Sequence, residues 1–127
     1  MGTGILTEPQ TIMRAHIQLD QVNSLVTAAG VEGARAILDA FQRSTTDLLA
    51  SMNKGVQGGA LVDASRDAHA VKGSAANVGA QLLADTAAMI EKACKAGDAA
   101  TAANMLCDAQ SLFDVFCAHF EAHLEQF

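Results

Sequence analysis

The sequence predicts an all-α protein built as an antiparallel four-helix bundle. Half of its 127 residues are hydrophobic, but only 4% are aromatic, and the chain contains a single proline. Because β-sheets draw on β-branched and aromatic residues, this alanine-rich composition favours helices. Apolar residues also recur at intervals of three and four along four long segments, as they do in helices buried on one side. Four such helices joined by short loops form an antiparallel bundle.

The N-terminal residues are expected to pack on the bundle as an additional element. We assign residues 1–19 to this N-terminal segment and residues 20–127 to the bundle domain. The pattern Thr7-Glu8-Pro9-Gln10 is typical of a helix start, with a capping threonine and a first-turn proline. Asp20 is expected to cap a second short helix, and Gly30 is expected to end it. Together these short helices are predicted to lie across one end of the bundle.

The first two bundle helices are expected on either side of a glycine-rich stretch. The first should run from about Val31 to Met52, and Lys54–Gly59 is the clearest loop in the sequence. The second should run from about Ala60 to Asn77, followed by a tight turn at Gly79. Its apolar stripe comprises Ala64, Ala68, Val71, Ala75 and Val78.

The last two helices are also predicted from the spacing of apolar residues and from turn residues between them. Periodicity resumes near Leu83, and Gly97-Asp98 is expected to end that helix and cap the next. The final helix should run from about Ala99 to the end of the chain. Its apolar residues are spaced 4-3-4-3-4, which is typical of a bundle seam: Ala102, Leu106, Ala109, Phe113, Phe116 and Phe120.

Charge, hydropathy and cysteine usage exclude several classes of function. The formal net charge is −6, and eight scattered Lys and Arg residues form no basic patch for nucleic acid. No apolar run approaches the length of about 18 residues that a membrane span needs, and no signal-peptide pattern is present. Cys94, Cys107 and Cys117 lack CxxC spacing, so we expect reduced, packed thiols in a cytoplasmic protein.

The stretch AHAVKGSAANVGA, residues 68–80, places a histidine on the solvent side of the second expected helix. At about 100° per residue, His69 points well away from the apolar stripe. Lys72 and Gly73, at i+3 and i+4, share its side of the helix. Glycine inside a helix costs about 1 kcal/mol relative to alanine. We therefore expect Gly73 to provide clearance for a bulky group that approaches His69.

An acidic partner for this histidine is expected on the next helix. If the hairpin turns at Gly79, the antiparallel neighbours of His69 fall between Ala87 and Glu91, and Glu91 is the polar residue of that window. A carboxylate that accepts a hydrogen bond from Nδ1–H fixes the ring tautomer and leaves the Nε2 lone pair outward. A solitary surface histidine usually has no function, but these neighbours favour an oriented nucleophile.

The pattern His69-x-x-Lys72-Gly73-Ser74-Ala75-x-x-Val78-Gly79-Ala80 resembles the signature of histidine-containing phosphotransfer (HPt) domains of bacterial and fungal phosphorelays. Leu83, Ile90-Glu91 and Lys95-x-Gly97-Asp98 also fall where such domains commonly have similar residues. The resemblance covers roughly residues 20 to 125. Val71 departs from it conservatively, because leucine is more usual there.

The resemblance implies a phosphocarrier rather than an enzyme. His69 would accept a phosphoryl group on Nε2 from a receiver-domain phospho-aspartate and pass it to another response-regulator receiver. Lys72 would stabilise the phosphoryl charge, Gly73 would provide clearance, and Glu91 would orient Nδ1. The partners would be receiver domains and a hybrid histidine kinase. No cofactor or metal of its own is implied, since magnesium belongs to the receiver.

Three alternatives remain open from the sequence. The chain could be an inactive bundle that serves only as an interaction module, although the intact motif argues against this. A histidine kinase dimerisation-type bundle usually carries an acidic residue directly after its histidine, whereas Ala70 follows here. His119 and His123, at i and i+4, have a spacing that can bind zinc, but no third ligand is evident.

The surroundings of the histidine suggest how partners would bind. Receivers are expected to contact an apolar patch around His69, formed by Ala70, Gly73 and Ala76 and completed by the segment Ile12–Leu19. A monomer is expected, because the bundle's own core uses all the patterned apolar seams. No contact with nucleic acid or membrane is expected, given the charge and hydropathy described above.

Overall fold

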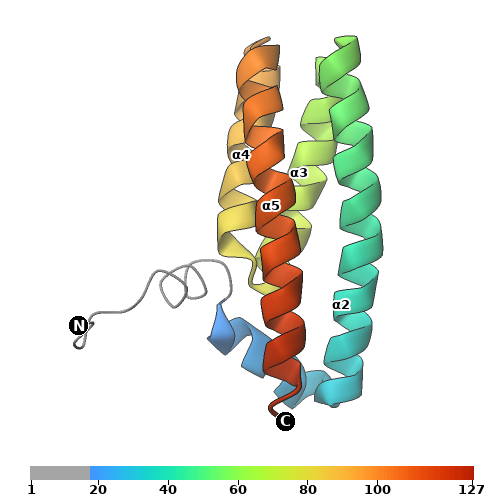
Figure 1. Ribbon diagram of the computed structural model, residues 1–127, viewed down its shortest axis with the longest axis vertical. Helices are drawn as coiled ribbons and strands as arrows, with labels where there is room; N and C mark the ends of the chain where they lie inside the picture. Colours follow the sequence, from blue (N-terminus) through green and yellow to red (C-terminus); the bar gives the residue numbers. More distant parts are fainter. Residues whose placement is uncertain (1–17) are drawn as a thin grey trace, which may run out of the picture.

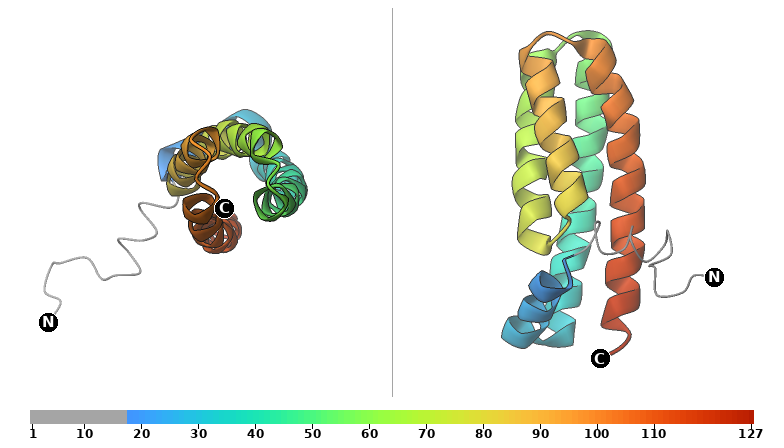
Figure 2. Two further views of the ribbon diagram at one scale, coloured as in Figure 1. Left: turned by 90° about the horizontal axis from the view of Figure 1, so that it is seen from above. Right: turned by 90° about the vertical axis from the view of Figure 1, so that its left-hand side faces the viewer.

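The computed structural model describes residues 18–127 and confirms the predicted all-α bundle. Its helices are α2 (Leu19–Gly58), α3 (Leu61–Val78), α4 (Gln81–Lys95) and α5 (Ala99–Leu124), and this range contains no strand. Each helix packs against the next, and α5 returns to pack against α2, which closes the bundle (Figures 1 and 2). The predicted features of residues 1–17, including the helix start at Thr7–Gln10 and the apolar residues from Ile12 onward, lie outside the described residues.

None of the helices in residues 18–127 combines the length and the apolar character that spanning a bilayer requires.

Helix α2 is bent at Gly30, as the predicted helix stop at this residue suggested. Gly30 has φ 77° and ψ 171°, a combination that is essentially restricted to glycine. The part before the bend, Leu19–Ala29, is called the arm below. It lies across the lower end of the bundle, beneath α3 and α4 (Figures 1 and 2).

The predicted N-cap of this segment is wrong by two residues. The helix begins at Leu19 with Gln18 in the N-cap position, and Asp20 lies in the first turn. The backbone N–H of Gln18 donates to the carbonyl of Gly79 at 2.8 Å, so a tertiary hydrogen bond fixes where the arm begins. A side-chain cap is therefore not what sets this boundary.

The arm is held against the turn between α3 and α4. Besides the Gln18 bond, Gln21 Nε2 donates to the carbonyl of Asn77 at 2.9 Å, and Val22 is fully buried. Gly79 has φ 85°, and a Cβ at this position would lie 3.1 Å from Gln21 Cβ and 3.2 Å from the carbonyl oxygen of Gln18. The turn glycine thus permits both the left-handed backbone and the close approach of the arm.

The predicted loop at Lys54–Gly59 is wrong, because α2 remains helical to Gly58 and only Gly59 turns, with φ 80°. Gly55 accounts for the difference. A Cβ there would lie 3.1 Å from the carbonyl oxygen of Ala60 and 3.2 Å from Ala64 Cβ. Its role is therefore to let α3 start close against α2, and it does not break the helix.

The core fills the space between the helices with aromatic rings and alanine. Phe41 of α2 packs edge-on against Phe113 and Phe116 of α5, with ring centroids 5.8 and 5.6 Å apart. The predicted seam of α5 is confirmed, because all six of its residues are buried. Small side chains, chiefly alanine, make up much of the buried faces of α3 and α4. These two helices consequently form a compact pair.

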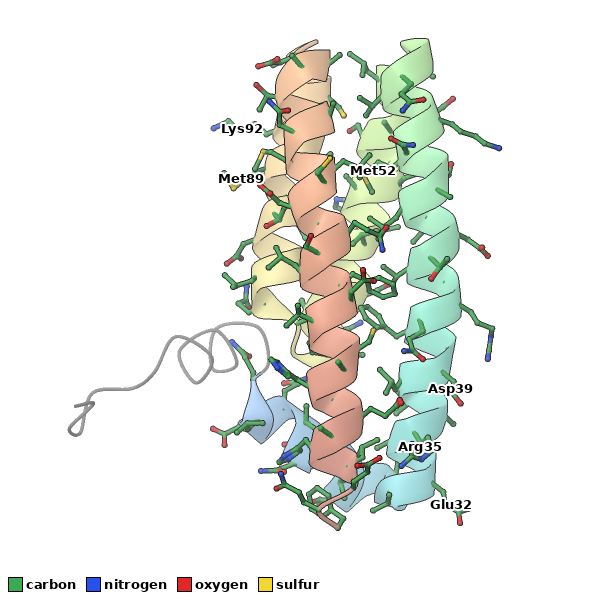
Figure 3. All side chains as sticks on the ribbon, viewed as in Figure 1. Glu32, Arg35, Asp39, Met52, Met89 and Lys92 are labelled. Carbon is green, nitrogen blue, oxygen red and sulfur yellow. The ribbon has the colours of Figure 1, made fainter. Side chains whose placement is uncertain are left out.

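Side-chain placement follows the predicted periodicity elsewhere. Met52 points into the bundle and is fully buried, whereas Met89 projects from α4 and is 54% exposed (Figure 3). Asp98 caps α5, as predicted, by accepting a hydrogen bond from the backbone N–H of Thr101 at 3.1 Å.

The three cysteines are free thiols, but only Cys94 and Cys117 are buried. The prediction of packed thiols is wrong for Cys107, which is exposed on α5.

We expect Gly79→Ala to lower the free energy of unfolding by about 1–3 kcal/mol, because it combines a disfavoured left-handed φ with a collision against the arm. Chemical denaturation followed by circular dichroism measures this change. Gly58→Ala is the matched control, since it is helical and a Cβ there meets nothing within 4 Å; its stability should be unchanged or raised. Equal effects of the two substitutions would contradict the dual role assigned to Gly79.

Candidate functional site

His69 lies on the solvent-facing side of α3. Its side chain is 67% exposed, while Ala68 and Val71 are fully buried on the core side of the same helix. The helical period alone accounts for this placement, because successive residues point about 100° apart. The ring is therefore accessible to another macromolecule.

Glu91 of α4 lies directly beside the ring. His69 Nδ1 is 3.2 Å from Glu91 Oε2 and 3.4 Å from Oε1. An ionised carboxylate only accepts hydrogen bonds, so Nδ1 carries the proton and donates it. The lone pair of the neutral ring is then on Nε2, which is the nitrogen away from Glu91.

Two lysines share the same carboxylate. Lys72 Nζ is 3.2 Å from Glu91 Oε1, and Lys95 Nζ is 2.9 Å from Oε2. We call these four residues, His69, Lys72, Glu91 and Lys95, the Glu91 cluster. The sequence interpretation gave Lys95 no place in the site. The signal that could have found it is the i, i+4 spacing of Glu91 and Lys95 on one helix.

The carboxylate at the centre of the cluster is held in its ionised form. The hydrogen bond from Lys95 contributes most to lowering the pKa of Glu91 from 4.5 to about 2, and the hydrogen bonds from Lys72 and His69 add to it. Burial opposes the shift, because the Glu91 side chain is only 12% exposed. Two cations surround one carboxylate, so the cluster is net positive within an acidic protein.

Gly73 leaves open space one helical turn after His69. It is exposed, and a Cβ built on it would meet nothing within 4 Å. Among residues 18–127, nothing therefore requires glycine at this helical position. Open space of this kind is what the predicted clearance role of Gly73 requires.

The other histidine pair is not arranged as a metal site. His123 Nε2 lies 3.0 Å from Asn23 Oδ1 of the arm, and its ring packs edge-on against Phe127. Within residues 18–127, no group of three or more His, Cys, Asp or Glu side chains is placed to hold a metal ion. The contacts of His123 instead fasten the arm to the end of α5.

The arrangement can present a nucleophilic or phosphoryl-accepting nitrogen on a rigid surface. It offers one oriented imidazole, two ammonium groups within reach of a common anion, and an unobstructed approach. Among residues 18–127, the hydrogen bonds of His69 involve Glu91 alone and use Nδ1, so no acid or base there contacts Nε2 as a Ser-His-Asp triad would require.

Comparisons with known proteins agree with this geometry. The family model described as Hpt domain matches residues 36–127. The chain is similar to the crystal structure of histidine-containing phosphotransfer protein B (HptB) from Pseudomonas aeruginosa PAO1, with a TM-score of 0.81 and 22% sequence identity. That alignment covers 88% of this chain and 96% of the other, and at this identity it shows a shared fold. No curated protein matches the chain.

The lowered pKa of Glu91 predicts how the stability of the protein depends on pH. A carboxylate with a depressed folded pKa contributes stability above its unfolded value near 4.5, and this contribution is lost as the pH falls towards 2. We expect the wild type to lose more stability than Glu91→Gln between about pH 6 and about pH 3, because the amide does not titrate. Urea denaturation of both proteins across this range measures the difference. Parallel pH profiles would contradict the ion-pair assignment.

Proposed function

The chain belongs to the Hpt domain family, whose members transfer phosphoryl groups through a histidine in phosphorelays, and we propose that His69 is the residue that carries the group here. The observation that carries this assignment is the contact of His69 Nδ1 with Glu91 on an exposed helix face. It leaves Nε2 as the nitrogen that meets an incoming partner.

The transfer step follows from this tautomer. The Nε2 lone pair attacks the phosphorus of a receiver's aspartyl phosphate, the P–O bond to the aspartate breaks, and the aspartate leaves as a carboxylate. The proton stays on Nδ1, where the Glu91 carboxylate balances the positive charge of the phosphorylated ring. In the reverse step a second receiver's aspartate attacks phosphorus and the neutral imidazole leaves. In-line positioning and charge stabilisation are what phosphoryl transfer chiefly needs.

Lys72 and Lys95 are proposed to neutralise the transferred group. A phosphoryl group brings about 1.5 to 2 negative charges at neutral pH. Both ammonium groups are anchored on Glu91 beside the ring, and both lysine side chains remain partly exposed, at 39% and 66%. They can therefore turn towards an anion on Nε2 without disturbing the core.

The partners are proposed to be receiver domains and a histidine kinase. Gly73 and Ala76, both exposed on α3, lie next to His69 on the route by which a receiver would approach. The chain is proposed to act as a cytoplasmic, monomeric phosphocarrier with no cofactor of its own, the magnesium ion being supplied by the receiver.

We expect His69→Gln to abolish phosphoryl uptake from a phosphorylated receiver domain, because the side-chain amide offers no nucleophilic lone pair. The measurement is the appearance of acid-labile, base-stable label on the protein. His119→Gln and His123→Gln serve as controls and should still take up label. Label on the His69 variant would overturn the assignment, and no uptake by the wild type from any receiver would favour the interaction module.

A substitution at Gly73 tests the proposed clearance role separately from the role of His69. We expect Gly73→Leu to slow phosphotransfer on the order of 10- to 100-fold, since a bulky side chain displaces the incoming receiver from the in-line geometry. The fold should persist, because the side chain would enter open space. Ala40→Leu, at an exposed position of α2, is the matched control and should transfer at the wild-type rate. An unchanged rate for Gly73→Leu would remove the clearance role while leaving that of His69 intact.

A further inference from the structure

A long groove follows α2 and α5 on the side of the bundle opposite His69. The helices form a closed ring in which α3 and α4 carry the Glu91 cluster and α5 and α2 form the opposite pair (Figure 2). Two hollows, with volumes of about 320 and 360 Å³, are lined by both of these helices, and a third of about 360 Å³ is lined by α2 alone. Thr46 lines all three. The shared residue makes the three hollows neighbours along α2.

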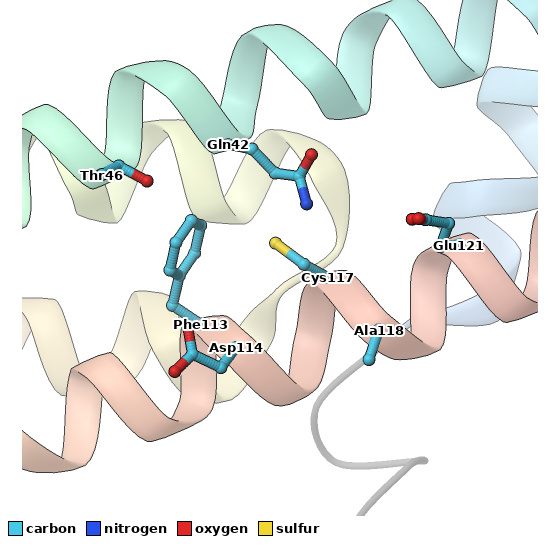
Figure 4. Close-up of a pocket in the computed structure, with 7 residues that line it drawn as sticks. All are labelled: Gln42, Thr46, Phe113, Asp114, Cys117, Ala118 and Glu121. Carbon is cyan, nitrogen blue, oxygen red and sulfur yellow. The ribbon is translucent and has the colours of Figure 1, made fainter.

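The floor of the groove is apolar. Leu49, Leu106, Phe113 and Cys117 line it, and each is less than a tenth exposed. Phe113 and Cys117 point into the space between the two helices (Figure 4). Since these side chains already belong to the core, an occupant would extend the core outward.

The α5 wall of the groove has the spacing of a second helix–helix seam. Nine α5 residues line the hollows, and six of them are spaced 4-3-4-3-4 along the helix: Ala103, Cys107, Gln110, Asp114, Cys117 and Glu121. Such spacing presents a continuous strip to a helix that runs alongside. The wall from Ala103 to Glu121 is about 27 Å long at about 1.5 Å per residue, which matches a helix of up to about 18 residues.

The rim of the groove is acidic. Asp47, Asp114 and Glu121 line it, and Arg43 is the one cation among its lining residues. Among the described residues, none of these three carboxylates takes part in an ion pair. All eight Lys and Arg residues lie at or before Lys95, so α5 carries no cation of its own.

The thiol of Cys117 reports this negative environment. Burial raises the pKa of this thiol most, and a hydrogen bond with Gln42 lowers it. The charges of Asp114 and Glu121 raise it further, and the resulting pKa is about 11. The thiol is therefore protonated at neutral pH and behaves as a small apolar group in the groove floor.

We propose that the α2–α5 groove binds a basic amphipathic helix of a partner protein. Its apolar side chains would enter the three hollows, and its Lys or Arg residues would pair with Asp47, Asp114 and Glu121. Groove-to-groove association with a second copy is disfavoured, because it would bring two acidic rims together. Since the groove lies opposite His69, a bound helix leaves the phosphorylation face free.

The probe is a 15-residue helical peptide of Leu, Ala and Lys with leucine at a/d positions, and its control has Glu in place of every Lys. We expect the Lys peptide to bind the full chain with a Kd on the order of 10 µM and the Glu peptide not to bind, by fluorescence anisotropy. Asp114→Lys with Glu121→Lys should weaken binding about ten-fold or more. Thr46→Phe, which fills the position common to the hollows, should abolish it.

Asp108→Lys combined with Asp39→Lys is the charge-matched control, because both residues are exposed and neither lines the groove. It should bind the Lys peptide like the wild type. Equal loss of binding in this control would overturn the proposal in favour of general attraction to an acidic protein. A dimer in light scattering that Thr46→Phe disrupts would assign the groove to a second copy. Tighter binding of a peptide with the sequence of residues 5–17 would assign it to this chain.

Phosphotransfer separates this proposal from the function proposed for His69. With the Lys peptide at saturation, we expect label uptake from a phosphorylated receiver to continue at the rate measured without it. Competition between the peptide and the receiver would overturn the claim of two independent faces. A failure of the His69 assignment would leave the peptide-binding results unaffected.

Discussion

The site depends on one carboxylate that is mostly buried yet fully ionised. Glu91 is enclosed between α3 and α4, where desolvation alone would favour its protonated form. Three hydrogen-bond donors, on Lys95, Lys72 and His69, reverse that preference and hold its pKa at about 2. Because the anion accepts from all three, it sets the tautomer of the imidazole and gathers two cations beside it. An amide at this position could orient the ring, but it would not attract the lysines in the same way.

The precision of this contact rests on how closely α3 and α4 are joined. Small side chains let the two helices pack tightly, and Gly79 turns the chain between them within a single left-handed residue. The arm and the preceding residue Gln18 then cover that turn, with hydrogen bonds from Gln21 to the carbonyl of Asn77 and from Gln18 to the carbonyl of Gly79. The hairpin is thus fixed at its turn by the arm and along its length by packing. A rigid support of this kind keeps a reactive group within the narrow geometry that group transfer requires.

Sequence periodicity predicted the features that follow from helical geometry alone. The exposure of His69, the hairpin that brings Glu91 opposite it and the seam of α5 all require only the helical repeat and a turn at Gly79. Predictions failed where a residue's role depends on a neighbour distant in sequence. The loop predicted at Gly55 is wrong because the contacts of Gly55 with Ala60 and Ala64 are tertiary. Lys95 is an exception, because its i, i+4 spacing from Glu91 on one helix already indicates the ion pair. Only the sharing of that carboxylate with Lys72 requires α3 and α4 to be paired. Asp20 does not cap the helix, because the hydrogen bond between Gln18 and Gly79 sets where the helix begins.

The uneven distribution of charge gives the two faces of the bundle different chemistry. The α3–α4 face concentrates Lys72 and Lys95 around one carboxylate, which suits a phosphoryl group and the acidic pocket that delivers it. The α2–α5 face carries Asp47, Asp114 and Glu121 around an apolar floor and suits a cationic partner. With a net charge of −6, long-range attraction alone would draw basic partners to the whole surface. The lysines of the Glu91 cluster would oppose that attraction locally, so a basic partner of the proposed kind would be directed to the groove and would leave His69 accessible.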